Sequence, residues 1–294
     1  MITARPRGDD ADFEQQRPRL EGLAYRITGS RSSAEDIVQD AWLRWQGADQ
    51  AAIERPAAWL TTVTSRLALD QLKSARHTRE TYVGPWLPEV ANADPGPAEQ
   101  AELAESVTIG FLTVLERLGP VERVVFLLAD VFGLPFDEIA TVVDKTPEAC
   151  RQIASRARTR VRQDRPRYAP TDDDAWQVSM AFMAAAQVGD LDSLVSLLAD
   201  DALAISDGGA DHHAARRPVV AERIPRFVAN LTTRAAEGTE YTLQLINGQP
   251  GVVCAVDGRP YLAIAFAVAG GQVQRVWTII NPDKLTTLSS PPIA

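Results

Sequence analysis

Residues 144–162 read DKTPEACRQIASRARTRVR, and this stretch decides the fold of the middle of the chain. It opens with three agreeing helix-start signals, because Thr146 can cap the helix, Pro147 suits its first position and Glu148 brings negative charge to its first turn. The apolar residues that follow recur at the helical period and share one face: Cys150, Ile153, Ala154, Ala157 and Val161. We therefore expect an amphipathic, strongly basic helix that begins at about Pro147.

The residues before this helix complete a helix-turn-helix. A helix fits residues 121–130, a turn fits residues 132–135 (FGLP) and a short helix fits residues 137–143. The second helix of such a motif enters the DNA major groove, which is about 12 Å wide, and Arg and Gln side chains there bind base edges and phosphates. The residues predicted to contact DNA in this way are Arg151, Gln152, Ser155, Arg156 and Arg158. The alternative is a solvated basic helix in an ordinary helical bundle.

Charge is distributed unevenly along the chain. The formal net charge is −9, but residues 145–167 hold eight Lys or Arg and only two acidic residues. Residues 172–294 hold 14 acidic and eight basic residues, and residues 81–105 hold five acidic residues and no basic one. A local basic segment of this kind is the electrostatic footprint of a nucleic-acid contact, whatever the sign of the total. The charge pattern therefore favours DNA binding by the helix that begins at Pro147.

The first 80 residues are predicted to be helical. Ser32 followed by Glu35 fits a capping box at the start of a helix, and residues 34–45 then carry apolar side chains at the helical period. We expect the two tryptophans of this helix to pack in a core. Pro56 fits the first position of a second helix, which runs to about His77 and ends in a basic cluster.

Two proline-rich stretches, residues 84–97 and 165–170, read as linkers that divide the chain into three segments. In the third segment, helices fit residues 175–187 and 191–198. Five later runs are rich in Val, Ile, Tyr and Phe, are separated by Gly, Asn and Asp, and read as strands: residues 203–206, 241–247, 252–256, 261–268 and 273–280. Helices followed by a strand meander predict an α+β domain with a curved sheet.

The composition indicates a soluble, cytoplasmic protein. Hydrophobic residues make up 45% and charged residues 23% of the chain, and no apolar stretch approaches the ~18–20 residues that cross a bilayer. The first 20 residues are polar, which argues against a secretory signal. Cys150 and Cys254 lie far apart without metal-ligand spacing, which argues against a disulfide framework and against zinc. We expect no metal and no cofactor.

These features together resemble a known family. Residues 25–30 (YRITGS) and 34–45 (AEDIVQDAWLRW) are similar to regions 2.1 and 2.2 of RNA polymerase sigma factors, and residues 55–76 are similar to regions 2.3 and 2.4. Residues 118–162 are similar to region 4. Nearly the whole chain thus resembles a sigma factor of the extracytoplasmic-function type.

The resemblance implies partners for each region. Region 2 would bind the clamp helices of the β′ subunit of core RNA polymerase through Asp36, Gln39, Asp40, Leu43 and Arg44. It would capture the melted −10 promoter element through Trp59, Thr62, Arg66, Lys73 and Arg76. An aromatic ring beside cationic side chains suits unstacked bases, although core packing is the alternative for the tryptophan. Region 4 would bind the β flap and read the −35 element of promoter DNA.

A short motif in the first linker narrows the resemblance. Residues 86–89 (WLPE) are similar to the linker motif of a sigma-factor subgroup that carries a fused C-terminal SnoaL-like domain, a cone with an apolar pocket. The matching positions expected to carry regulation are Trp86, Leu87, Pro88, Asp207, Asn281, Pro282, Asp283 and Lys284. Val90 stands where the motif ends in proline, and the glycine run after Asp207 is short. The motifs alone therefore leave open whether the linker contacts the C-terminal domain.

The sequence thus predicts a multidomain fold with two all-α sigma domains, the region 2 bundle and the region 4 helix-turn-helix, and a C-terminal α+β SnoaL-like or NTF2-like cone. The expected boundaries are 8–80 for region 2, 81–105 for the linker, 106–166 for region 4 and 172–288 for the cone. We expect a sigma factor that binds core polymerase and directs promoter-specific initiation, with the cone as a fused regulator. Such a regulator could take an unknown small ligand and would make a separate anti-sigma factor unnecessary.

Two other functions remain as alternatives. A ligand-responsive helix-turn-helix regulator that never joins polymerase would bind duplex DNA by itself, as a dimer. An enzyme of the SnoaL type with a DNA-binding passenger would need a general acid or base, for which Asp207, His212 and His213 are the candidates. Adjacent histidines on a strand point to opposite faces, so they do not readily share a metal. We expect no catalytic residue.

Overall fold

The computed structural model describes residues 8–80, 82–90, 108–164 and 173–288, except 211 and 213. By their contacts the residues form two compact units: residues 1–80 with 114–164, and residues 81–113 with 165–294. The linker after the first three helices therefore packs with the C-terminal domain. The fourfold division of the chain into region 2, linker, region 4 and cone stays a functional prediction.

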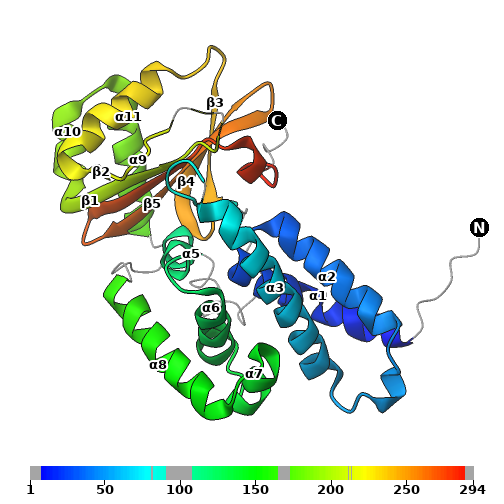
Figure 1. Cartoon of the computed structure of the whole chain (residues 1–294). Helices are drawn as coiled ribbons and strands as arrows, with labels where there is room; N and C mark the ends of the chain where they lie inside the picture. Colours follow the sequence, from blue (N-terminus) through cyan, green and yellow to red (C-terminus); the bar gives the residue numbers. More distant parts are fainter. Residues whose placement is uncertain are drawn as a thin grey trace, which may run out of the picture. The chain divides into compact units, whose positions relative to one another are not determined.

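Three helices form the N-terminal part of the first unit (Figure 1): α1 (Gly8–Thr28), α2 (Arg31–Gln46) and α3 (Pro56–Glu80), with a short 3-10 turn η1 (Gln50–Ala52) before α3. Their apolar faces meet in a core of Phe13, Leu20, Val38, Trp45 and Leu60, with Trp42 and Trp59 packed against it. The expected core position of the two α2 tryptophans is confirmed.

The expected capping box of α2 is wrong. The helix is capped by Ser30, whose hydroxyl accepts a hydrogen bond from the backbone N–H of Ser33 at 3.1 Å. Gly29 adopts a φ of 70° and ends α1, so the chain turns directly before Ser30. Ser32 therefore lies inside the first turn of α2 instead of at its cap.

The second helical group contains the helix-turn-helix. It comprises α5 (Ile109–Leu115), α6 (Pro120–Phe126), a π-helical turn η2 (Leu127–Val131), α7 (Phe136–Val143) and α8 (Pro147–Asp164). The predicted helix over residues 121–130 thus ends in a π-helical turn, because the N–H of Phe132 bonds to the carbonyl of Leu127. Asp144 closes α7 with a φ of 54°, and the hydroxyl of Thr146 accepts from the N–H of Ala149 at 3.2 Å. The predicted start of the basic helix at Pro147 is confirmed.

The second unit is the predicted α+β domain. Its elements, in chain order, are α9 (Asp173–Val188), α10 (Leu191–Leu197), β1 (Leu198–Asp207), β2 (Val219–Val220), η3 (Ala221–Arg223), α11 (Ile224–Thr233), β3 (Glu240–Ile246), β4 (Gln249–Val256), β5 (Arg259–Ala269), β6 (Gln272–Ile279) and η4 (Pro282–Lys284). The six strands form one sheet in the order β2-β1-β6-β5-β4-β3, in which β1 runs parallel to β6 and the other pairs are antiparallel.

Helix α11 was not predicted from the sequence, and β1 begins earlier than predicted. Pro225 lies in the first turn of α11, where its missing N–H costs nothing, but a proline among short apolar runs reads as loop. Strand β1 already begins at Leu198, and its pairing with β6 shifts register between Leu198 and Leu203. The acidic residues in that irregular stretch are exposed, so no period-2 alternation marks it as a strand.

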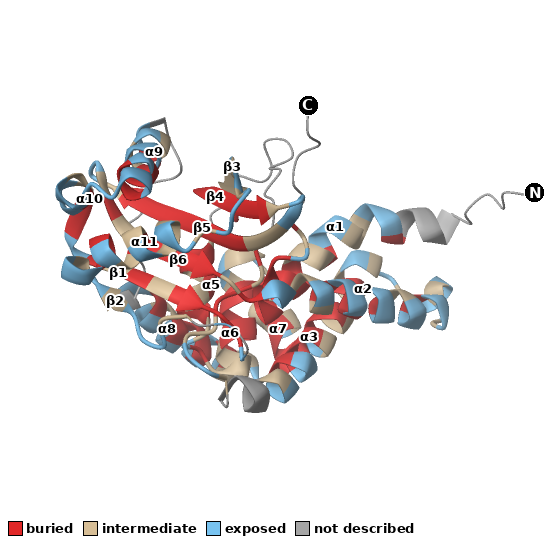
Figure 2. Ribbon diagram, turned by 90° about the horizontal axis from the view of Figure 1, so that it is seen from above, coloured by how far each residue is buried: buried red, intermediate tan, exposed pale blue. Residues whose placement is uncertain are grey.

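Both faces of the sheet are covered. On one face, α9, α10 and α11 (Figure 1) enclose a core that includes Phe182, Leu194, Val228 and Phe266. On the other face, Trp277 and Ile279 share a core with two sets of apolar residues. One set is Leu285 and Leu288, which follow β6, and the other is Leu87, Val90 and Ile109 of the linker. Every residue of β5 from Leu262 to Val268 is consequently buried (Figure 2). The linker is thus part of the hydrophobic core of the second unit.

Replacement of Leu87 by alanine tests this role of the linker. Leu87 is fully buried, so the cavity left by L87A should lower the free energy of unfolding of the second unit by about 2–5 kcal/mol. Hydrogen exchange of β4–β6 peptides during denaturant unfolding measures the change. The matched variant V83A alters a half-exposed linker side chain and should have little effect. Equal stability of the two variants would contradict a core role for Leu87.

Candidate functional site

Helix α8 presents one polar face to solvent. Arg151, Gln152, Ser155 and Arg156 are exposed and, at their spacing along the helix, lie next to one another. The opposite face of α8 is buried through the five predicted apolar residues from Cys150 to Val161. The helix therefore offers hydrogen-bond donors outward while its apolar side fixes its orientation against α6 and α7.

Arg158 differs from the other predicted DNA contacts. Its Nε donates to the two carboxylate oxygens of Asp130 at 2.8 and 3.1 Å, and its side chain is 39% exposed. Arg160 likewise pairs with Glu122 at 2.6 Å. Part of the positive charge of α8 is therefore neutralised inside the first unit. The sequence could not separate Arg158 from Arg156, because the partner lies 28 residues away.

The predicted polymerase-binding residues form an exposed row on α2. Asp36, Gln39, Asp40, Leu43 and Arg44 all face solvent, at positions that share one side of the helix. Leu43 is 57% exposed, an unusual position for a large apolar side chain flanked by charges.

The residues expected to hold the −10 element do not share one environment. Trp59 is half-buried against Trp45, with ring centroids 5.5 Å apart, so packing holds the expected aromatic platform. The hydroxyl of Thr62 donates to the carbonyl of Ala58. Lys73 is exposed and lies 3.6 Å from the carboxylate of Asp70. The side chain of Arg76 lies outside the described residues.

Arg66, the remaining residue of this set, is occupied by the helix-turn-helix. Its guanidinium donates to the carbonyl of Thr141 in α7 at 2.7 Å, and Arg55 pairs with Glu138 of the same helix at 2.7 Å. A buried contact accompanies these exposed ones. The guanidinium of Arg123 in α6, whose side chain is only 3% exposed, donates to the carbonyl of Ile27 at 3.0 Å and pairs with Glu116 at 2.7 Å. In the first unit, α3 is therefore packed directly on the helix-turn-helix.

A second cluster of polar groups surrounds Asp207, at the end of β1. Its side chain is completely buried and accepts hydrogen bonds from the hydroxyl of Tyr82 at 2.5 Å, the N–H of Leu87 at 2.7 Å and the N–H of Gly209 at 3.1 Å. The ammonium of Lys284 lies 2.6 Å from the same carboxylate. Two of these four partners belong to the linker, so a buried charge of the C-terminal domain depends on the linker for its hydrogen bonds.

Lys284 completes the cluster from the other side. Its Nζ also donates to the carbonyl of Leu87 at 2.5 Å and lies over the rings of Trp86 and Tyr82, 4.0 and 5.0 Å from their centroids. The side chain of Lys284 is 6% exposed. A carboxylate, a carbonyl and two aromatic faces together replace the water that a buried ammonium loses.

Tyr82 and Asn281 bridge the same groups. The amide nitrogen of Asn281 donates to the hydroxyl of Tyr82 at 3.0 Å, while its oxygen accepts from the N–H of Asp283. Burial and the hydrogen bond to Asp207 raise the pKa of the Tyr82 phenol, so the hydroxyl remains a donor at neutral pH. We call Tyr82, Trp86, Leu87, Asp207 and Lys284 the linker anchor.

The anchor unites most of the positions predicted from motif resemblance. Asp207 and Lys284 contact Leu87, Lys284 lies over Trp86, Asn281 bonds to Tyr82, and Pro88 is buried. Pro282 and Asp283 are exposed and shape the turn η4. Sequence reasoning missed Tyr82 and Thr287, whose hydroxyl donates to the carbonyl of Val90. The departure from the motif at Val90 does not prevent the contact, because the bonds at Leu87 and Val90 use backbone atoms.

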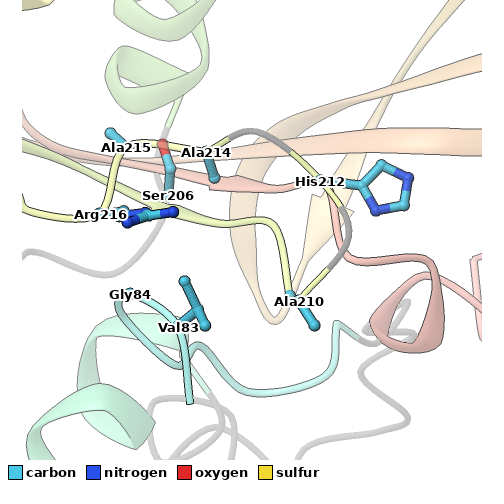
Figure 3. Close-up of a pocket in the computed structure, with 9 residues that line it drawn as sticks. Val83, Gly84, Ser206, Ala210, His212, Ala214, Ala215 and Arg216 are labelled. Carbon is cyan, nitrogen blue, oxygen red and sulfur yellow. The ribbon is translucent and has the colours of Figure 1, made fainter. Parts of the chain in front are cut away.

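A small pocket lies beside the anchor. It has a volume of about 110 Å³, and its walls are Val83 and Gly84 of the linker, Ser206, and residues of the loop between β1 and β2, including Arg216 (Figure 3). The exposed ring of His212 points away from the other labelled residues, and His213 lies outside the described residues. Asp207, one of the candidate acid–base residues, is held in a buried ion pair with Lys284.

The two cysteines show no sign of a reactive or metal-binding role. Cys150 and Cys254 are free and buried. Burial raises the pKa of the Cys150 thiol, and it raises the pKa of the Cys254 thiol to about 12. Neither is an activated thiolate at neutral pH. Within the described ranges, no group of three or more His, Cys, Asp or Glu side chains could hold a metal ion. No helix in that part of the chain has the length and apolar character of a membrane span.

Comparison with known proteins gives the class of the first unit. The Sigma-70 region 2 family matches residues 13–78, which cover α1–α3, and the Sigma-70 region 4 family matches residues 110–161, which cover the helix-turn-helix. The first matched range contains the exposed face of α2, and the second contains the exposed face of α8. A helical unit of this composition is the promoter-recognition part of a sigma factor.

Full-length relatives extend the comparison to the whole chain. The ECF RNA polymerase sigma factor SigJ of Mycobacterium tuberculosis is 42% identical over 290 residues, which cover 94% of this chain and 93% of that protein. The probable ECF sigma factor SigI of the same organism is 34% identical over 284 residues, 95% of each chain. The crystal structure of SigJ superposes with a TM-score of 0.75 at 39% identity, and covers 95% of this chain and 98% of that one. The chain belongs to the ECF RNA polymerase sigma factor family.

This membership confirms the predicted family, its SigJ-like subgroup and the predicted fold. The match to SigJ includes the C-terminal α+β domain, so the sigma factor and the fused domain form one inherited arrangement. The alternative of a helix-turn-helix regulator without polymerase is thereby wrong, since the chain also carries region 2.

A double-mutant cycle tests the linker anchor. Asp207→Asn and Lys284→Met each leave one buried charge without its partner, so each should destabilise the second unit by about 3–5 kcal/mol. The double variant removes both charges and should recover part of that loss, because no unpaired charge remains. Denaturant unfolding gives the energies, and limited proteolysis reports release of residues 82–90. Strictly additive effects with an unchanged cleavage pattern would contradict the anchor.

Proposed function

We propose that this sigma factor binds core RNA polymerase through the exposed row on α2, holds the −10 element with α3, and reads the −35 element with α8. The C-terminal domain restrains these steps by holding the linker between regions 2 and 4. The observation that carries the regulatory part is the linker anchor, in which the buried carboxylate of Asp207 takes two hydrogen bonds from the linker.

Reading of the −35 element is supported by the outer face of α8. Arg156 is exposed and, among the described residues, forms no ion pair, so it can contact a base without first breaking one. Arg158, in contrast, is paired with Asp130. Arg151 contacts Glu148 one turn away in an exposed pair, which DNA phosphates readily replace. We propose Arg151, Gln152, Ser155 and Arg156 as the reading face, and Arg158 as a residue that positions α8.

Binding of the −10 element requires the first unit to open. Arg66 donates to the carbonyl of Thr141, so the guanidinium must leave α7 before it reaches DNA. The −10 and −35 elements are separate sites along the duplex, whereas α3 and α7 are in direct contact in this structure. The packed arrangement is therefore a resting state, and promoter binding separates α3 from the helix-turn-helix.

Restraint by the C-terminal domain follows from the same geometry. Residues 82–90 of the linker are held by the C-terminal domain, so this part of the linker adds no length when regions 2 and 4 move apart. The fused domain takes the place of a separate anti-sigma factor in this proposal. A small ligand would act from the pocket beside Gly84, since one of its walls is the linker itself. Catalysis is not part of the proposal, because Asp207 is consumed by the anchor.

Two arginines of α8 provide a matched test of −35 reading. Arg156→Ala should weaken binding of the holoenzyme to its own promoter by about tenfold or more, because a base contact is lost, and should relax the preference among −35 sequences. Arg158→Ala should instead lower stability and leave the sequence preference unchanged, because its side chain is held by Asp130. Binding titrations on wild-type and altered −35 fragments measure both. An identical preference in the two variants would argue against this assignment.

Run-off transcription with core polymerase tests the regulatory proposal in the full-length chain. A chain cut at residue 165 would leave Leu87, Val90 and Ile109 uncovered, so point variants are the better probe. Asp207→Asn should raise promoter-specific initiation about fivefold by releasing the linker. Asp257→Asn removes the same charge from an exposed hairpin turn and should change nothing. Initiation by D207N that equals wild type, or falls below it, would overturn restraint by the anchor.

A further inference from the structure

Positive charge in the C-terminal domain is gathered in one stretch. Residues 172–294 hold 14 acidic and eight basic residues, and five of those basic residues, all arginines, lie within residues 216–234. The same stretch holds a single acidic residue, Glu222. The rest of the domain is left with 13 acidic and three basic residues. A local basic stretch of this kind is typical of a surface that meets a polyanion.

Helix α11 turns most of this charge to one side. Arg226, Asn230 and Arg234 follow one another at intervals of four residues, which places them on one side of the helix. Arg223 precedes Arg226 by three residues and extends the same side toward the start of α11. All four side chains are exposed, whereas the apolar residues on the opposite side are buried in the core of the domain. We call Arg223, Arg226 and Arg234 the basic face of α11.

The guanidinium groups of the basic face are available to another molecule. Among the described residues they form no ion pair and no hydrogen bond, whereas Arg275 of the same domain donates to the carbonyl of Asp201. Their charge does not stabilise the helix either. Arg223 is the N-cap of α11 and Arg226 lies in its first turn, which has no acidic residue, and a cation at this end opposes the helix dipole. An anion from outside the domain would complete the arrangement.

We propose that the basic face of α11 binds phosphates of promoter DNA without reading the base sequence. The C-terminal domain is then a third DNA-binding part of this sigma factor, beside regions 2 and 4. This inference goes beyond restraint through the linker anchor and does not depend on it. The anchor uses none of the three arginines, so the contact can form whether the anchor holds or has released.

The chemistry of the face favours DNA phosphates over other partners. Its cations are arginines, whose planar guanidinium groups form two parallel hydrogen bonds with a phosphate. Phe227, the aromatic residue of this stretch, is packed against the core, so the face offers no ring that could stack on unpaired bases or enter a lipid surface. The 13 acidic residues elsewhere in the domain repel DNA, which leaves the basic face as the side that approaches the duplex.

The salt dependence of promoter binding measures this contact in the full-length holoenzyme. Each phosphate that an arginine neutralises steepens the fall of log K with log salt by about 0.9. The triple variant R223Q/R226Q/R234Q should therefore bind with a slope that is shallower by about two to three, and the single variant R226Q with one that is shallower by about one. The matched control R259Q removes the same charge from an exposed arginine outside the stretch and should leave the slope unchanged.

Two further measurements separate lost charge from other effects. The triple variant R223K/R226K/R234K keeps the charge and should keep the wild-type slope. The triple glutamine variant should keep the wild-type preference among altered −35 fragments, because phosphate contacts carry no sequence information. Denaturant unfolding checks that the second unit of each variant is intact, and R226Q replaces the triple variant if the latter does not fold.

An unchanged slope in the triple glutamine variant would overturn the inference. Weaker binding to core polymerase with an unchanged slope on DNA would assign the face to an acidic protein surface, and would overturn it too. A slope that becomes equally shallow in the lysine and glutamine variants would trace the effect to side-chain shape, against a charge contact. Asp207→Asn leaves the basic face in place, so initiation by that variant decides on restraint by the anchor independently of the salt slope.

Discussion

The buried ion pair of Asp207 and Lys284 is the constraint on which the second unit depends. A carboxylate without water needs several donors, and here two of them come from a linker more than a hundred residues earlier in the sequence. The C-terminal domain therefore cannot hold this pair in its present form without the linker. Hydrophobic burial points the same way, because Leu87, Val90 and Ile109 cover the sheet face that carries Trp277. The C-terminal unit consequently includes the linker between regions 2 and 4, and does not begin only after region 4.

This arrangement explains why the chain divides into units that are discontinuous in sequence. Region 2 and region 4 pack together in the first unit, while the segment that joins them belongs to the second. Contacts such as Arg66 to the carbonyl of Thr141 and Arg55 to Glu138 are exposed, and exposed pairs of this kind contribute little stability. Arg123 is different, since its buried guanidinium loses its partners when the regions part. Arg26 of α1, which is only 6% exposed, also lies over the ring of Phe132, 5.8 Å from its centroid, so buried arginines as well as exposed pairs join the two regions.

The sequence predicted the parts of the fold that local signals specify. Thr146, Pro147 and the apolar period placed the start of α8 at the correct residue, and Pro56 did the same for the start of α3. It failed where tertiary context decides: Ser30 and not Ser32 caps α2, Pro225 lies inside a helix, and β1 begins in an acidic stretch. Motif resemblance named Asp207 and Lys284, but no local pattern shows that these two meet Tyr82. The continuous apolar run of β5 was the available hint, because a strand with both faces buried needs a second cover.

Because the linker covers one face of the sheet, regulation by this fused domain differs from regulation by a separate protein. A separate inhibitor dissociates, and its effect depends on concentration, whereas a fused domain acts at a fixed effective concentration that its linker sets. Here that linker is itself the segment that the domain binds, so the usual freedom of a tether is absent. Any signal that frees the sigma regions must therefore weaken a contact within the second unit. The anchor around Asp207 is positioned to respond, because it ties residues 82–87 of the linker to the end of β1.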